Sequence, residues 1–101
     1  MREQVINGKL YSTDLSEPLA GHCSSFANTD PRHYVEVLYR KHNGEYFLYC
    51  WGGPQSKYAN AGLRRGDNSR IIVVSPEEAR LWCKKYGSPR AYATIWTQTK
   101  I

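Results

Sequence analysis

Hydrophobic and polar residues alternate along residues 34–52, and Asn43-Gly44 divides this stretch near its middle. Asn and Gly both tolerate the positive φ of a type I′ turn, so the pair predicts a β-hairpin. If His42 pairs with Glu45, the alternation places one set of side chains on the same face: Val35, Val37, Tyr39, Leu48 and Cys50. This set is apolar, so we expect it to be the core side of a sheet, packed against the helix that bears Trp82.

The opposite face of the same hairpin combines aromatic rings with charge. It carries Tyr34, Glu36, Leu38, Arg40, Phe47, Tyr49 and Trp51. Three arrangements fit this pattern: a covering helix or loop of the same chain, a symmetric dimer, or a surface that binds a partner. We favour a partly exposed face that binds a partner, and we expect replacement of Glu36 by alanine to leave stability almost unchanged.

Short patterned runs elsewhere complete the sheet. A second Asn-Gly pair at residues 7–8 predicts a turn or a very short N-terminal hairpin. Residues 18–25 predict a strand that runs antiparallel into the main hairpin, and the β-branched run at 71–75 predicts a buried strand. We expect these strands to form a meander.

The C-terminal third has the pattern of helices. Ser75 as N-cap, Pro76 at the first helical position and Glu78 in a capping box predict a helix start, and Gly87 predicts its end. An apolar stripe at helical spacing is typical of a core and consists of Ala79, Trp82, Cys83 and Tyr86. Residues 88–101 fit a short helix or a strand, and we take the helix. The predicted fold class is α+β, an antiparallel β-meander of three or four strands packed against one or two C-terminal helices.

Length and composition favour one small globular domain that spans residues 1–101, with 41% hydrophobic residues. No segment approaches the roughly 18 apolar residues of a membrane span, and the N-terminal residues lack the apolar run of a signal peptide. The three cysteines are odd in number and form no CxxC pair, which favours reduced thiols. We therefore expect a cytoplasmic protein.

The formal charge of +5 favours encounters with nucleic acid or with an acidic protein surface. Residues 52–70 read as a long loop, and positive charge is densest there: Lys57, Arg64, Arg65 and Arg70 accompany a single acid, Asp67. This basic loop either contributes to partner encounter or is merely solvated.

Catalytic and metal-binding patterns are missing from the sequence. No two His or Cys residues have the spacing of a zinc site, and no glycine-rich phosphate loop precedes a helix. Cys50 has no sequence signal for a partnered histidine or an activating helix N-terminus. We expect no enzyme activity, no metal and no cofactor.

Three segments carry a resemblance: "NGKLYSTD", "LYRKHNGEYFLYCWGGPQSKYA" and "IIVVSPEEARLWCKKYG". Together they resemble a family of small, mostly uncharacterised proteins of phages, plasmids and conjugative elements of bacteria. Cys50-Trp51 stands where a Gly-Glu-like pair is usual in that family, which makes this chain more basic and more aromatic. The resemblance implies an accessory protein in a bacterial host cell that binds host or viral machinery, as inhibitors of CRISPR or restriction systems do.

The pattern and the resemblance together predict a non-enzymatic binding protein. It would occlude a bacterial protein or ribonucleoprotein complex, as anti-CRISPR inhibitors do, because Trp, Tyr and Arg dominate interface energetics. The alternative is a basic protein that binds single-stranded nucleic acid through stacking rings and phosphate contacts. The predicted contact residues are Tyr34, Arg40, Phe47, Tyr49, Trp51, Lys57, Arg64, Arg65 and Arg70.

Overall fold

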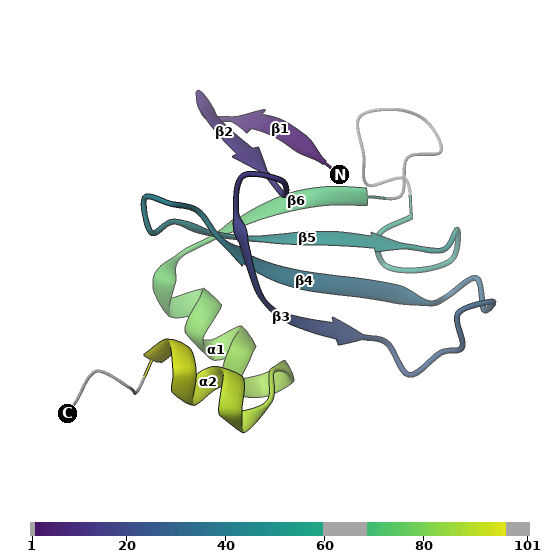
Figure 1. Ribbon diagram of the computed structural model, residues 1–101. Helices are drawn as coiled ribbons and strands as arrows, with labels where there is room; N and C mark the ends of the chain where they lie inside the picture. Colours follow the sequence, from purple (N-terminus) through teal and green to yellow (C-terminus); the bar gives the residue numbers. More distant parts are fainter. Residues whose placement is uncertain (1, 60–68, 97–101) are drawn as a thin grey trace.

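A computed structural model describes residues 2–59 and 69–96 (Figure 1). Its elements are β1 (Glu3–Ile6), β2 (Lys9–Ser12), β3 (Glu17–Cys23), β4 (Tyr34–Arg40), β5 (Tyr46–Gly52), β6 (Ser69–Val74), α1 (Pro76–Tyr86) and α2 (Pro89–Trp96). The fold is α+β, as the sequence predicts. Neither helix within the described residues is long and apolar enough to cross a membrane.

The main sheet has four antiparallel strands in the order β3-β4-β5-β6. Each strand pairs with its neighbour in the sequence, which confirms the predicted meander and places the β4–β5 hairpin at its centre. Strands β1 and β2 form a separate two-stranded hairpin. Asn7 and Gly8 both have positive φ there, 52° and 79°, as a type I′ turn requires.

The β4–β5 turn differs from this pattern. Lys41 N–H donates to the Glu45 carbonyl at 2.7 Å, so the loop contains the three residues 42–44. Gly44 has a φ of +91°, whereas Asn43 is not in the left-handed region. Instead, the Asn43 side chain accepts a hydrogen bond from the Glu45 N–H at 3.0 Å, which is the usual side-chain role of Asn in turns. A longer loop therefore replaces the predicted two-residue turn.

The longer loop shifts the strand register by one residue. Leu38 pairs with Leu48 and Tyr39 with Phe47, whereas the predicted register pairs Tyr39 with Leu48. Because side chains alternate along a strand, this shift changes which residues of β4 and β5 share a face. The predicted core set was therefore wrong in part: Val35, Val37 and Tyr39 do not lie on the side of Leu48 and Cys50.

One side of the sheet, here called the helix face, packs against α1 and α2 (Figure 1). Leu38, Cys50, Ala79 and Cys83 are fully buried between the sheet and α1, and Leu48 is nearly so. The predicted contact of Leu48 and Cys50 with the helix stripe is confirmed. Trp82 and Tyr86, which complete the stripe, are half-buried.

The other side of the sheet, here called the hairpin face, packs against β1–β2. The Tyr11 ring meets Phe47 edge-on at 5.6 Å, and Tyr39 stacks on Phe47 at 5.2 Å. Phe47 is fully buried and Ile71 is 4% exposed. The N-terminal hairpin therefore closes a second, smaller core.

The two helices begin as their sequences predict. Ser75 and Glu78 form the complete capping box of α1. At α2, Ser88 Oγ accepts a hydrogen bond from the Ala91 N–H at 3.0 Å, and Trp96 stacks on Tyr46 at 6.0 Å. The helix interpretation of this segment is confirmed for residues 89–96.

Candidate binding surfaces and a buried carboxylate

The residues predicted to form one contact surface lie on opposite sides of the sheet. Tyr34 and Arg40 belong to the helix face, whereas Phe47, Tyr49 and Trp51 belong to the hairpin face. The one-residue register shift is the cause, so the prediction of a shared face was wrong. Arg64 and Arg65 lie outside the described residues.

The cations of this set have different surroundings. Arg40 forms an ion pair with Glu17 at 2.9 Å on the edge strand β3. Arg70 is exposed on the edge strand β6, opposite Cys50 in the register. Lys57, assigned to the basic loop, forms an ion pair with Glu36 at 3.1 Å and is therefore anchored to the sheet.

The hairpin face keeps an open region beyond the cover of β1–β2. We call it the Tyr49–Trp51 patch, and it consists of Cys23, Val35, Val37, Tyr49 and Trp51. The two rings lie 5.0 Å apart, and Trp51 is 37% exposed. Of the rings predicted for this face, Phe47 is buried, so Tyr49 and Trp51 are the two that a partner can reach.

Glu36 is the centre of a buried polar cluster on the helix face. Its side chain is only 5% exposed, and it accepts a hydrogen bond from Trp82 Nε1 at 2.9 Å. The Tyr58 hydroxyl donates to its second oxygen, and the Lys57 ammonium group lies 3.1 Å from that same oxygen. The structure contradicts the expectation that Glu36 contributes little, because three donors from two segments, the one after β5 and α1, converge on this carboxylate.

These contacts fix the protonation states of the cluster. Burial raises the pKa of Glu36, but hydrogen bonds from Tyr58, Trp82 and Lys57 outweigh burial, and the pKa lies below its ordinary value. Burial raises the pKa of Cys50 to about 11, so its thiol stays protonated at neutral pH. Burial and the bond to Glu36 also raise the pKa of Tyr58. Tyr58 is therefore a neutral donor to an ionised carboxylate.

The segment after β5 positions Lys57 and Tyr58 by joining the β3–β4 loop. Gly53 N–H donates to the His33 carbonyl and Gln55 N–H to the Pro31 carbonyl, each at 2.8 Å. A side chain at Gly53 would collide with the Pro31 carbonyl oxygen. Glycine at this position therefore allows the segment after β5 to pack directly against the backbone of the β3–β4 loop, where the chain turns back over the sheet.

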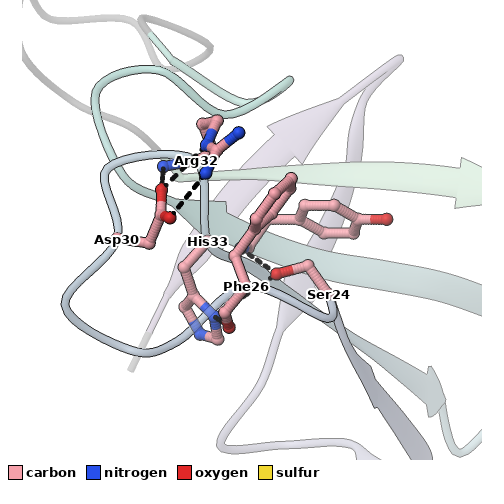
Figure 2. A network of polar contacts seen from close by, with 6 residues as sticks. Ser24, Phe26, Asp30, Arg32 and His33 are labelled. Atoms are coloured by element: carbon pink, nitrogen blue, oxygen red, sulfur yellow. Dashed lines mark hydrogen bonds and ion pairs between the residues drawn. The ribbon is translucent and has the colours of Figure 1, made fainter.

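The β3–β4 loop has its own polar network, shown in Figure 2. His33 Nδ1 lies 3.0 Å from the Phe26 carbonyl oxygen and 3.3 Å from Ser24 Oγ. Because a carbonyl oxygen only accepts, Nδ1 carries the proton and is no base toward Ser24. Ser24 Oγ in turn accepts a hydrogen bond from the Tyr34 N–H at 3.1 Å. This serine–histidine contact closes a loop and is not a nucleophile with its base.

Asp30 and Arg32 complete this loop. The Arg32 guanidinium group donates two hydrogen bonds to Asp30, at 3.0 and 2.8 Å, and lies 4.2 Å from the centre of the Phe26 ring. Hydrogen bonds from Arg32 lower the pKa of Asp30 to about 2. The acidic and the basic side chain of the loop therefore neutralise each other.

Sequence reasoning missed the Glu36 cluster and the β3–β4 network, although one signal for the cluster was present. Glu36 is an acid between apolar residues of a central strand, and such a residue requires partners when it is buried. Among residues 2–59 and 69–96, no three His, Cys, Asp or Glu side chains gather closely enough to hold a metal ion. The chain matches no protein-family model, no curated protein and no solved structure.

Proposed function

We propose that this protein is a non-enzymatic binding protein that occludes a macromolecular partner through the Tyr49–Trp51 patch. The observation that carries the proposal is the pair of adjacent rings on a sheet face that α1 and α2 leave open. The core under β1–β2 reaches the edge of Tyr49, which is half-buried, and leaves Trp51 37% exposed. Trp and Tyr bury a large area at small entropic cost and dominate the energetics of protein interfaces. Val35 and Val37 beside the rings would complete an apolar centre.

The chemistry of the buried groups supports binding rather than catalysis. The Glu36 carboxylate already accepts from Tyr58, Trp82 and Lys57. Activated thiol nucleophiles have a lowered pKa, whereas burial raises the pKa of Cys50. Each of these groups has a complete structural role, which leaves none of them poised for proton transfer or attack.

The partner is a protein or ribonucleoprotein complex of the bacterial host. The sequence resemblance to proteins of mobile elements suggests a defence nuclease complex, and the charge of +5 suits an assembly that presents acidic or phosphate groups. Self-association through the same patch is the competing arrangement, since a symmetric dimer would also bury the two rings.

A pull-down from host bacteria tests the proposal, followed by titration of the identified partner in purified form. The Tyr49→Ala/Trp51→Ala variant should lose binding at least tenfold, because each hot-spot ring contributes about 2 kcal/mol or more. Leu81→Ala is the control, since Leu81 is 57% exposed on α1, away from the patch.

Two outcomes would reject the proposal. One is equal binding by the double variant and by the control. The other is a wild-type dimer in light scattering that the double variant converts to a monomer, which would assign the patch to self-association. Circular dichroism melting of each variant shows that loss of binding is not loss of fold.

A further inference from the structure

A row of three rings with a lysine at each end crosses the helix face at the end distant from the β4–β5 turn. We call it the lysine–ring row, and it consists of Lys57, Tyr34, His22, Tyr86 and Lys85. The residues come from the segment after β5, from β4, from β3 and from the last turn of α1. This surface is separate from the Tyr49–Trp51 patch, which lies on the opposite side of the sheet.

Neighbouring members of the row are in contact. Lys57 Nζ lies 4.6 Å from the centre of the Tyr34 ring, and the Tyr34 and His22 rings are 6.0 Å apart. His22 stacks on Tyr86 at 4.1 Å with an interplanar angle of 30°. At the other end, Lys85 Nζ lies 5.0 Å from the centre of the Tyr86 ring. Three rings therefore lie between two ammonium groups.

Solvent reaches the row. The Lys57 side chain is 53% exposed, Lys85 is exposed, and the three rings are half-buried. Within the described part of the chain, Glu36 is the carboxylate that contacts the row: it pairs with Lys57 at 3.1 Å and also accepts from Tyr58 and Trp82 beneath the surface. Among the described residues, the Lys85 ammonium group contacts the Tyr86 ring and forms no ion pair with a carboxylate. Its charge is therefore available to a ligand.

We infer that the lysine–ring row binds single-stranded nucleic acid. The two lysines match phosphates, which supply most of the affinity of such complexes, and the rings match bases, whose faces stack on aromatic side chains. In the free protein Lys85 lies over the Tyr86 ring, and its flexible stem lets the ammonium group move from the ring to a phosphate. Lys57 is held beside Tyr34 by its ion pair with Glu36, and its side chain is 53% exposed to a phosphate at that position. Movement of Lys85 would free the face of Tyr86 for a base.

The row favours a single strand over the other anionic partners. Bases of a duplex are stacked on one another, so half-buried rings that lie along a sheet and a helix end cannot reach their faces. An acidic polypeptide would satisfy the lysines and leave the rings without a role. Single-stranded nucleic acid has a phosphate and an accessible planar base in every nucleotide, so it can contact both the lysines and the rings.

Fluorescence anisotropy with labelled oligo(dT) of about 12 nucleotides tests the inference, since single-strand sites span roughly 4–16 nucleotides. The full chain should bind at low salt, with an affinity that falls as salt rises. A duplex of the same length should bind at least about tenfold more weakly, because it offers phosphates without accessible bases.

Lys85→Glu and Lys84→Glu form a matched pair of variants. The two lysines are adjacent and exposed in the last turn of α1, but only Lys85 is placed over a ring of the row. Lys85→Glu should weaken oligo(dT) binding about tenfold or more, and Lys84→Glu less than about threefold, because a direct phosphate contact is lost only in the first. Lys57 is unsuitable for this test, because its reversal would also disturb Glu36.

The rings are tested by Tyr86→Leu with Tyr92→Leu as its control. Tyr92 lies on α2, where its hydroxyl accepts from Arg80 at 2.8 Å, outside the row. Tyr86→Leu should reduce affinity about fivefold or more, as loss of one stacked base would, and Tyr92→Leu should leave it unchanged. Far-ultraviolet circular dichroism confirms that both variants fold.

Several outcomes would overturn the inference: no binding of oligo(dT) at low salt, equal binding of duplex, or equal losses for the two lysine variants. Competition by poly-glutamate as strong as by unlabelled oligo(dT), with no effect of Tyr86→Leu, would assign the row to an acidic protein. The Tyr49→Ala/Trp51→Ala variant should bind oligo(dT) like the wild type, so that this inference and the proposed function succeed or fail separately.

Discussion

Removal of the Glu36 carboxylate is the sharpest test of how this fold is held together. The Glu36→Ala substitution leaves Tyr58, Trp82 and Lys57 without their shared acceptor. These donors come from the segment after β5 and from α1, so the carboxylate joins three parts of the molecule at one point. The variant therefore probes the attachment of both segments to the sheet.

The magnitude follows from the exposure of each donor. Tyr58 is 7% exposed and Trp82 is half-buried, and a buried donor without a partner costs about 1–3 kcal/mol. Lys57 is 53% exposed and returns to water at a cost of about 0–1 kcal/mol. We expect Glu36→Ala to lower the free energy of unfolding by about 3 kcal/mol, most of it from the two donors, Tyr58 and Trp82, that lose their acceptor.

Urea denaturation with linear extrapolation measures this change. Glu17→Ala is the control, because Glu17 also pairs with a cation but is 62% exposed, and its loss should cost about 0–1 kcal/mol. Glu36→Gln should fall between the two, since its amide still accepts from Trp82 and donates to the Tyr58 hydroxyl. If Glu36→Ala and Glu17→Ala differ by less than about 0.5 kcal/mol, the cluster contributes no more than a surface pair and the reasoning is refuted.

Three further predictions follow from the loops and thiols. Hydrogen bonds from Lys9 and other donors lower the pKa of Glu45 from 4.5 to about 2. Its contribution to stability is therefore present above pH 4.5 and is lost as the pH falls toward 2. In the Glu45→Gln variant the melting temperature should fall less between pH 4.5 and pH 2 than in the wild type. Gly53→Ala should lower the melting temperature by at least about 4 °C, whereas Gly21→Ala, whose new Cβ meets its nearest atom at 3.7 Å, should change it little. With a thiol reagent, exposed Cys23 should react at once in the native protein, and Cys50, with its pKa of about 11, only after unfolding. Equal native rates for the two thiols would contradict the buried position of Cys50.

Local signals predicted the elements well and their pairing less well. The capping box of α1 and the strand order depend on residues that are close together in the sequence, and both are confirmed. The two Asn-Gly pairs had the same signature, yet residues 7–8 form the two-residue turn and Asn43 does not. The Asn43 side chain accepts a hydrogen bond from Glu45 and so competes with the two-residue backbone turn. The three-residue loop that forms instead shifts the register by one residue, which reverses the predicted faces.

The Glu36 cluster was harder to predict, because its members are distant in sequence. Glu36, Lys57 and Trp82 meet only after the segment following β5 folds back and α1 packs on the sheet. Strand alternation identifies the face of a carboxylate but not the donors that will reach it. The same limit applies to the lysine–ring row, where His22 and Tyr86 are brought together by tertiary packing.

The docking of the β1–β2 hairpin has a consequence for protein synthesis. Tyr11 is synthesised before its packing partners Phe47 and Ile71, which belong to β5 and β6. At typical translation rates of about 5–20 residues per second, roughly 3–12 seconds separate the synthesis of Tyr11 from that of Ile71. During that interval the β1–β2 hairpin lacks part of the surface that it covers in the folded protein. The β1–β2 hairpin therefore reaches its native place only after β5 and β6 have been made.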